Sequence, residues 1–386
     1  MRGLYVHVPF CLRKCHYCNY TITAAPTADD HENFFRAIET ETRRARESYG
    51  ALQFSTLYLG GGTPSSLDAT EMERLFRILL GAFSLEKNAE VTCEVNPGEA
   101  DRAKLEAYRR LGVNRLSVGA QSFNDVLLAD MGRIHDARAT AEISAAARET
   151  GFENLSLDLI IRLPGQTLAD VEDSLERAVA AGARQVVIYD LNVHDETVYG
   201  ARARRGDLAL PPDSLHRRMH DAVAEILVTK HRFRQYEISS FARPGFESRH
   251  NLIYWKNREY LGLGPGAFSY MEGKRYQYAK TVQGWLERIR GGDASNEEEH
   301  ALRPEEIEIE TLLTGLRLED GVRLGDFDLI REHAAREVSA LEEAGLVERA
   351  GDRIRLTREG KALAETVFTR LSLAGGRPVF DKSGVI

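Results

Sequence analysis

The chain has 386 residues, 43% of them hydrophobic and 28% charged, with a formal net charge of −8 at pH 7. This composition predicts one large globular domain with a smaller one, and it excludes a disordered chain and a basic nucleic-acid-binding surface. Because no apolar run reaches about 18 residues and no signal segment precedes the first cysteine, we expect no transmembrane segment and a cytoplasmic location.

A predicted strand at residues 4–8 leads directly into a loop with three cysteines, Cys11, Cys15 and Cys18. Three thiolates at this spacing can bind three irons of a four-iron cubane and leave the fourth iron open for another ligand. A disulfide framework fits poorly, because this long chain has only four cysteines. A structural zinc site, with His7 or His16 as the fourth ligand, remains the alternative.

Up to about residue 240, short apolar runs alternate with segments of helical period, which predicts parallel strands joined by crossover helices. Apolar residues at spacings of three and four between residues 72 and 83 predict one such helix. Six units of this kind predict an α/β fold, a partial (β/α)6 TIM-like barrel over residues 1–240. The predicted strands are residues 4–8, 56–59, 90–95, 115–118, 155–160 and 186–191.

Polar and glycine-rich segments follow several of these strands, and the loops after barrel strands meet at one face. The segment 60–64 reads Gly-Gly-Gly-Thr-Pro, and its glycines allow backbone to approach a ligand or to form a tight turn. Glu94 and Asp158 lie at predicted strand ends, where a carboxylate can also cap a helix. Cys93 is interpreted as a buried core residue.

The last third of the chain has a different pattern. After a helix expected to end near residue 230 and a strand at 233–238, residues 241–300 form an irregular, aromatic-rich segment. Residues 301–375 predict a winged-helix-like domain, two helices followed by a hairpin and a final helix, and residues 376–386 form a tail. Acidic runs at 297–299 and 305–310 argue against DNA binding and favour protein contact or a lid.

Taken together, these segments resemble the oxygen-independent coproporphyrinogen III oxidase family of radical S-adenosylmethionine (SAM) proteins, and within it the heme chaperone (HemW) branch. The resemblance covers nearly the whole chain. It rests on residues 5–18, 60–64, 94–97, 119–123, 132–135, 158–166 and 236–239, and for the chaperone branch on residues 250–255 and 260–266.

The resemblance implies a radical SAM barrel in which Cys11, Cys15 and Cys18 ligate a 4Fe-4S cluster and the open iron binds SAM. An electron donor would reduce the cluster. If the protein is an enzyme, SAM would then be cleaved to a 5′-deoxyadenosyl radical. The residues expected to contact SAM are Tyr5, Tyr17, Gly61, Gly62, Thr63, Glu94, Gln121, Arg133 and Asp158.

The chaperone branch further implies that heme binds near His250, Tyr254 and Trp255 and is passed to a recipient protein. A histidine beside two aromatic residues is also the usual pattern of a packed histidine, so both interpretations of His250 remain open. The alternative function is a catalytic radical SAM enzyme, either a methyltransferase acting on a small molecule or a coproporphyrinogen oxidase. The oligomeric state is not predicted.

Some positions depart from the family pattern. Asn19 and Tyr20 replace the further cysteine of the oxidase branch, which counts against the oxidase. Arg162, Asp190 and His194 are more strongly charged than the chaperone branch commonly shows. We expect these three to lie near the barrel mouth, where they would mark a substrate pocket.

Overall fold

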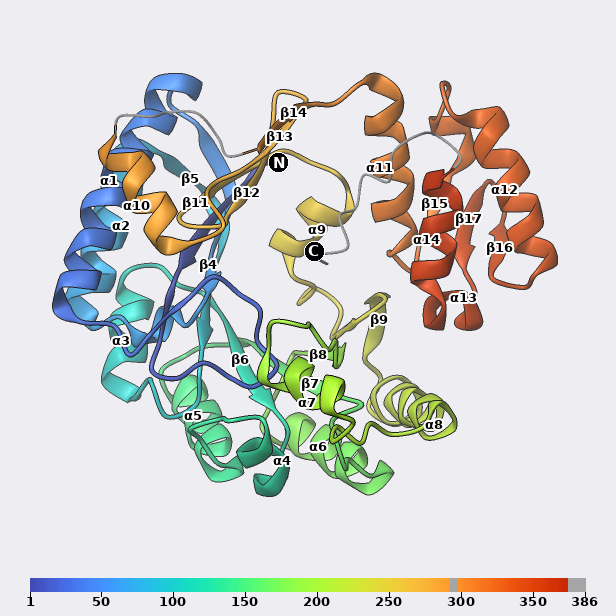
Figure 1. Ribbon diagram of the computed structural model, residues 1–386, viewed down its shortest axis with the longest axis horizontal. Coiled ribbons are helices and arrows are strands. Elements are labelled where there is room, and N and C mark those ends of the chain that lie inside the picture. The colour runs from blue at the N-terminus through green and yellow to red at the C-terminus, as the bar shows by residue number, and fades with distance from the viewer. Residues whose placement is uncertain (292–297, 374–386) are drawn as a thin grey trace.

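The chain folds around one large curved sheet with helices on its outer side (Figure 1). The computed structural model describes residues 1–291 and 298–373, so the predicted tail at 376–386 and residue 297 of the acidic run lie outside the described residues. The parallel strands, in spatial order, are β11 (Tyr260–Leu263), β1 (Gly3–Val8), β4 (Gln53–Gly61), β5 (Ser84–Val95), β6 (Arg115–Gln121), β7 (Asn154–Ile161) and β8 (Gln185–Asp190). Six of them match the predicted strands, which confirms the partial barrel.

Helices follow the barrel strands, and most of them cover the outside of the sheet, whereas α4 and α7 pack beside the loop that contains His16 (Figure 1). They are α1 (Ala28–Tyr49), α2 (Ala69–Ala82), α3 (Arg102–Arg110), α4 (Asp125–Asp130), α5 (Ala137–Glu149), α6 (Leu168–Ala180), α7 (Val198–Arg205) and α8 (Asp213–Val223). The helix α8 continues as a π-helix, η2 (Ala224–Lys230). Within the described ranges, none of the helices has both the length and the apolar character needed to cross a bilayer.

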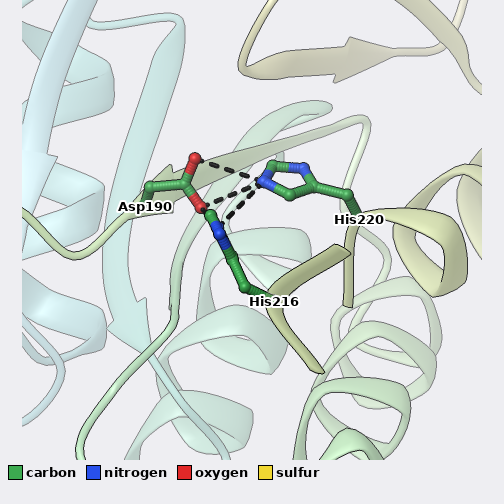
Figure 2. Close-up of side chains that lie close together, drawn as sticks. All are labelled: Asp190, His216 and His220. Carbon is green, nitrogen blue, oxygen red and sulfur yellow. Dashed lines mark hydrogen bonds and ion pairs between the residues drawn. The ribbon is translucent and has the colours of Figure 1, made fainter. Parts of the chain in front are cut away.

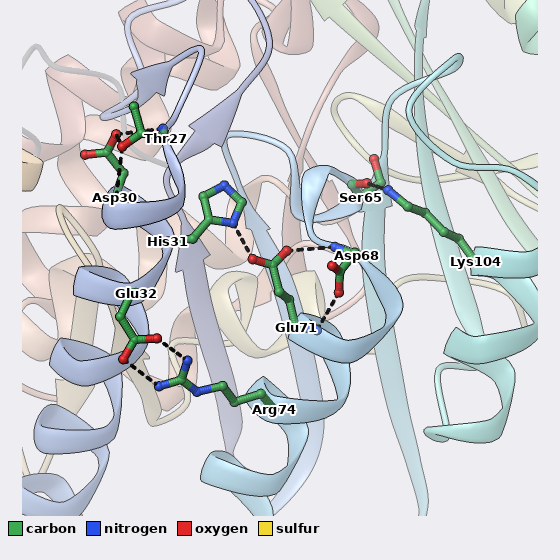
Figure 3. A network of polar contacts seen from close by, with 9 residues as sticks. All are labelled: Thr27, Asp30, His31, Glu32, Ser65, Asp68, Glu71, Arg74 and Lys104. Carbon is green, nitrogen blue, oxygen red and sulfur yellow. Dashed lines mark hydrogen bonds and ion pairs between the residues drawn. The ribbon is translucent and has the colours of Figure 1, made fainter.

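The starts of α1 and α2 show why these helices begin where they do. The Thr27 hydroxyl accepts the Asp30 N–H at 3.2 Å, and the Asp30 carboxylate accepts the Thr27 N–H at 2.8 Å. Asp68 and Glu71 form the same reciprocal cap on α2. Two contacts then join the helices side by side (Figure 3), the ion pair of Glu32 with Arg74 and the hydrogen bond between His31 and Glu71.

The apolar stripe of α2 packs on the sheet as expected, with one exception. Met72, Leu75, Phe76 and Leu79 are at most 3% exposed. Leu80, which the predicted stripe included, is 45% exposed. It follows Leu79 by one residue, or about 100° around the helix, and this turns its side chain away from the sheet.

The strand register separates an apolar layer from a polar interior. Leu4, Val6 and Val8 of β1 are at most 1% exposed and belong to the main hydrophobic core. Because side chains alternate along a strand, Tyr5 and His7 point to the opposite, concave face. Tyr5 is in register with Tyr58 of β4, and their rings lie 6.1 Å apart. The concave face therefore carries the polar and aromatic side chains.

The segment 241–300 is more regular than predicted. It extends the sheet beyond β1, since β11 pairs parallel with β1 as a seventh parallel strand. Beyond β11, the sheet continues with antiparallel strands. The strand predicted at 233–238 is β9 (Arg234–Glu237), and the other elements up to residue 301 are β10 (Ser240–Ala242), α9 (Arg249–Trp255), β12 (Phe268–Met271), β13 (Lys274–Gln277), α10 (Val282–Arg290) and β14 (Glu298–Ala301). The expectation of an irregular segment is therefore wrong. A sequence pattern does not reveal these strands because they are short and separated by turns that contain glycine.

The C-terminal region has a hydrophobic core of its own, which includes Leu312, Val338 and Val367. Its elements are α11 (Pro304–Leu316), β15 (Val322–Arg323), the short 3-10 helix η3 (Leu324–Asp326), α12 (Arg331–Glu343), β16 (Val347–Ala350), β17 (Arg353–Leu356), α13 (Arg358–Ala362) and α14 (Ala364–Leu373). Two helices, a hairpin and closing helices make the winged-helix-like order that the sequence predicted. The exact domain boundaries stay a prediction.

The acidic stretch 305–310 makes contacts within the molecule. Glu310 is 2% exposed and pairs with Arg275 of β13 at 2.6 Å. The Glu308 carboxylate accepts the Leu329 N–H at 2.9 Å. These carboxylates fix α11 to the sheet and to the following loop. Their proposed use in a protein contact or as a lid remains a prediction.

A buried carboxylate of α1 predicts a pH-dependent stability. Glu41 is 2% exposed and accepts N–H groups from Gly264, at 2.7 Å, and from the Trp285 indole, at 3.2 Å. Burial raises its pKa to about 8, although both hydrogen bonds act in the opposite direction. The folded state therefore retains a proton that the unfolded chain has already released above about pH 4.5.

We expect the free energy of unfolding to fall as the pH rises from about 4.5 to 8, by on the order of 4 kcal/mol from this group. Glu41→Gln carries no titrating proton, so its stability should change less over this range. Urea unfolding of both proteins at about pH 4.5 and about pH 9 measures the difference. Equal losses in the two proteins would contradict the assignment to Glu41.

Candidate functional site

The cysteine loop lies beyond the end of β1, at the edge of the sheet where the parallel strands end. It begins with β2 (Phe10–Cys11), which pairs with β3 (Thr23–Ala24). The His16 N–H donates to the Met131 carbonyl at 2.9 Å, which ties the loop to the end of α4. All four cysteines are among the described residues, and none of them forms a disulfide. Cys11, Cys15 and Cys18 are partly exposed.

Two of the three sulfur atoms have a polar partner from a different loop. The Thr63 hydroxyl lies 3.4 Å from the Cys11 Sγ, and the Arg133 Nη1 donates to the Cys15 Sγ at 3.5 Å. Burial raises the pKa of Cys11 to about 12 and also raises the pKa of Cys18. A bound metal reverses this effect, because a coordinating thiol loses its proton. Three soft ligands with hydrogen-bond donors beside them fit an iron–sulfur cluster.

The two histidines considered as a fourth zinc ligand differ in how their ring nitrogens are engaged. Both ring nitrogens of His7 have partners, the Tyr5 hydroxyl at 3.1 Å and the Thr21 carbonyl at 2.8 Å. The Nδ1 of His16 lies 2.6 Å from the Asp130 carbonyl. His7 is therefore not available as a ligand in this conformation, whereas the contact of His16 with a carbonyl leaves its Nε2 able to bind a metal, so the zinc alternative with His16 stays open.

The glycine run at the end of β4 packs against the cysteine segment. Gly61 has a φ of 105°, and a Cβ there would meet the His7 ring at 2.6 Å. A Cβ at Gly62 would meet the Phe10 carbonyl oxygen at 2.7 Å. These glycines therefore permit the close approach that places Thr63 beside Cys11. Contact between SAM and Gly61, Gly62 or Thr63 stays a prediction.

Arg133 is the centre of a polar network next to the cysteines. Its Nη2 donates to the Asn96 Oδ1 at 2.6 Å and to the Gly119 carbonyl at 2.9 Å. Among the described residues, its partners are the Cys15 sulfur, an amide oxygen and a backbone carbonyl, and none of them is a carboxylate. Gln121 lies at the end of the same strand as Gly119, with a φ of 63°. Tyr17 is close to this network, and burial raises its pKa.

Two carboxylates lie in the barrel interior, below the cysteine loop. Glu94 accepts a hydrogen bond from the Tyr58 hydroxyl at 2.8 Å, and burial raises its pKa to about 7. Asp158 accepts hydrogen bonds from Ser117 and Ser156, and burial raises its pKa to about 6. Neither side chain caps a helix. Buried acids with raised pKa values are typical of functional sites.

His250 lies toward the opposite end of the strands. Its Nδ1 is 2.7 Å from the Thr56 hydroxyl, and its Nε2 is 2.8 Å from the Tyr254 hydroxyl. Thr56 is in register with Gly3, at the start of β1, whereas the cysteines follow the end of β1. The side chain is 1% exposed, and burial lowers its pKa to about 3. In this conformation His250 is a packed, neutral histidine.

Trp255 contributes to a different contact. The Arg317 guanidinium lies 4.2 Å from the centre of its ring, so Trp255 joins α9 to the residue that ends α11. The ring does not stack on His250; Tyr58 does, with its ring centre 5.0 Å from that of the histidine. The structure brings Tyr254 and His250 together and places Trp255 beside the C-terminal region.

Sequence reasoning assigned no role to Arg115. This arginine is 1% exposed, and its Nε and Nη1 have no hydrogen-bond partner within the described part of the chain. Its positive charge interacts electrostatically with Glu90, Tyr58 and Asp158. Its position at the start of a predicted buried strand could have indicated a special role, because a charged residue is unusual there.

The expected charged pocket is arranged differently from the prediction. Arg162 has a φ of 65° and lies 3.6 Å from Asp213 of α8. Asp190 contacts His216 and His220 instead of His194. Both Arg162 and Asp190 find their partners on α8, and Asp190 is in register with Ile161, the residue before Arg162. A substrate pocket formed by Arg162, Asp190 and His194 stays a prediction.

Comparison with known proteins gives consistent matches along the chain. The family model of the radical SAM superfamily matches residues 5–178, and that of the HemN C-terminal domain matches residues 302–363. The heme chaperone HemW of Bacillus subtilis is 35% identical over 95% of this chain and 98% of its own length. HemW of Synechocystis is 38% identical over 82% of this chain and 78% of its own.

A solved structure shows the same fold. The radical SAM enzyme coproporphyrinogen III oxidase (HemN) of Escherichia coli superimposes with a TM-score of 0.83. The match covers 96% of this chain and 89% of that one, at 22% identity. The likeness therefore includes both the barrel and the C-terminal region.

Proposed function

The chain belongs to the radical SAM superfamily and, within it, to the family of the heme chaperone HemW. On this basis we propose that it binds heme and passes the heme to a partner protein. The main support is the 35% identity to a curated heme chaperone along almost the full length of both chains. We also place the protein in the cytoplasm, where a reducing environment keeps thiols available for iron.

We propose that Cys11, Cys15 and Cys18 hold the 4Fe-4S cluster. Such a cluster, when bound and reduced by an electron donor, supplies the electron that cleaves SAM. The contacts of Thr63 and Arg133 with two of the three sulfurs support a SAM site at this place. The residues proposed to line it are Tyr5, Tyr17, Gly61, Gly62, Thr63, Glu94, Gln121, Arg133 and Asp158.

The proposed heme ligand is His250, whose binding to iron requires that one of its two present hydrogen bonds be replaced. With a pKa of about 3, the imidazole is neutral at pH 7 and one ring nitrogen carries a lone pair. If Nδ1–H donates to Thr56, Nε2 accepts the hydrogen bond from the Tyr254 hydroxyl. The iron would then take the place of this hydroxyl. Because His250 is buried, α9 must move, and Tyr254 and Trp255 would become free to contact the heme.

A catalytic radical SAM reaction is the second candidate function. The shared fold with the Escherichia coli oxidase and the half-buried acids Glu94 and Asp158, both with raised pKa values, favour it. In that case the interior would hold a small molecule. A coproporphyrinogen or a methyl acceptor would be its substrate, and the carboxylates would bind or exchange protons with it.

One experiment separates these candidates. The chain is reconstituted anaerobically with iron and sulfide, and heme or coproporphyrinogen is added with SAM and a reductant. We expect saturable uptake of one heme per chain, seen as a shift of its main absorption band, and no loss of carboxyl groups from coproporphyrinogen. Formation of 5′-deoxyadenosine together with decarboxylated product would instead support the enzyme.

Arg133 is expected to set the reduction potential of the cluster. Its guanidinium lies 3.5 Å from the Cys15 sulfur and is partly buried, so its positive charge would favour the reduced cluster. Arg133→Met should lower the potential by on the order of tens of millivolts. A redox titration followed by electron paramagnetic resonance measures this shift. Arg177→Met, at a partly exposed arginine of α6, is the control and should leave the potential unchanged.

A further inference from the structure

Asp190, His216 and His220 form a compact group where β8 meets α8 (Figure 2). The His216 Nε2 lies 2.6 Å from the Asp190 Oδ1, and the His220 Nε2 lies 3.1 Å and 3.2 Å from the two carboxylate oxygens. Asp190 ends β8, and the histidines are four residues apart, on one face of α8. Nothing in the proposed heme or SAM function uses this group.

The two Nε2 atoms are only 3.2 Å apart and face the same carboxylate. If both rings are neutral and each donates its Nε2–H to Asp190, the two hydrogen atoms are crowded against each other beside the same carboxylate. A single cation satisfies both nitrogen lone pairs and the carboxylate at once. Ligands about 2.0–2.1 Å from a tetrahedral zinc lie about 3.3 Å from one another. The 3.1–3.2 Å separations are close to this value, and only the His216–Asp190 distance must lengthen.

We propose that Asp190, His216 and His220 bind a divalent first-row transition metal, separate from the cysteine cluster. Two imidazoles and one carboxylate are a ligand set for Zn²⁺ or Fe²⁺, whereas Mg²⁺ prefers oxygen ligands. The side chains are between 21% and 46% exposed, so a metal can enter from solvent. Three protein ligands also leave a coordination position for water or a small molecule.

The site also joins the barrel to a helix that contacts the C-terminal region. On α8, Arg217 lies 3.5 Å from Glu359, and Asp221 pairs with Arg358 of α13. A metal between Asp190 and the two histidines would fix α8 against β8. It would therefore also restrain the contact between the barrel and the winged-helix-like domain.

Zinc titration of the cluster-loaded chain tests the proposal, because the cysteines are then occupied by iron. Calorimetry should show one Zn²⁺ bound per chain and no binding of Mg²⁺. His216→Ala, His220→Ala and Asp190→Asn should each weaken Zn²⁺ binding about tenfold or more. Hydrogen exchange of the α8 amides should slow when Zn²⁺ is added to the unchanged chain.

His231→Ala is the matched control. His231 pairs with Glu176 at 2.9 Å, so this variant also loses a histidine–carboxylate contact, but one without a second histidine. It should bind Zn²⁺ as the unchanged chain does. Asp190→Asn retains the size of the side chain, so its effect does not depend on misfolding. The proposal is overturned if the unchanged chain binds no Zn²⁺, or if the three variants bind it equally well.

Discussion

Single replacement of Cys11, Cys15 or Cys18 by alanine should abolish the 4Fe-4S cluster. With three protein ligands, loss of one leaves two of the four irons without a thiolate, and the cube is no longer held. We expect iron and sulfide to fall from about four of each per chain to near zero after anaerobic reconstitution. Chemical iron and sulfide analysis, together with the visible absorption of the cluster, measures this loss.

Cys93→Ala provides the control for this prediction. Cys93 is 0% exposed and lies in the core, as the sequence predicted, with its side chain on the face opposite to that of Glu94. This variant should keep a full cluster and lose only some packing stability. A full cluster in a Cys15→Ala variant, or its loss in Cys93→Ala, would show that the ligands are assigned wrongly.

Heme affinity should respond in opposite directions to two changes at the same site. His250→Ala removes the proposed iron ligand, and heme should bind at least about tenfold more weakly, equivalent to about 1.4 kcal/mol. Tyr254→Phe removes the hydroxyl that lies 2.8 Å from Nε2 but retains the ring. This change frees the nitrogen for iron, so heme should bind more tightly than to the unchanged chain.

The pair of variants distinguishes ligation from structural damage. General loosening of α9 would weaken heme binding in both variants, whereas competition for Nε2 predicts opposite signs. Absorption titrations with heme, carried out on the cluster-loaded proteins, give both affinities. Unchanged affinity in His250→Ala would remove this residue as the ligand and leave the family assignment in place.

The sequence predicted those parts of the fold that depend on local pattern. The strands β1 and β4–β8 are apolar runs separated by helical periods, and the core of the C-terminal region follows a clear order of helices and a hairpin. The strands β11–β13 were missed because they are four residues long and separated by glycine turns. Their strand character comes from pairing with β1 and with each other, which a local pattern does not show.

The site was predictable only where its residues are close in sequence. The three cysteines lie within eight positions, so their spacing alone indicated a metal site. Asp190 and His220 are 30 residues apart and meet only because α8 packs beside the end of β8. The buried state of His250, and its hydrogen bond to Thr56, likewise depend on α9 packing over the starts of β1 and β4.

Transfer of heme to a recipient tests the central claim most directly. The chain, loaded with cluster and one heme, is mixed with membranes that contain a heme-free b-type cytochrome, in the presence of excess apomyoglobin to trap free heme. The account predicts that heme reaches the cytochrome despite the trap, and that transfer fails with His250→Ala. Capture of all the heme by apomyoglobin, or equal delivery by the variant, would contradict it.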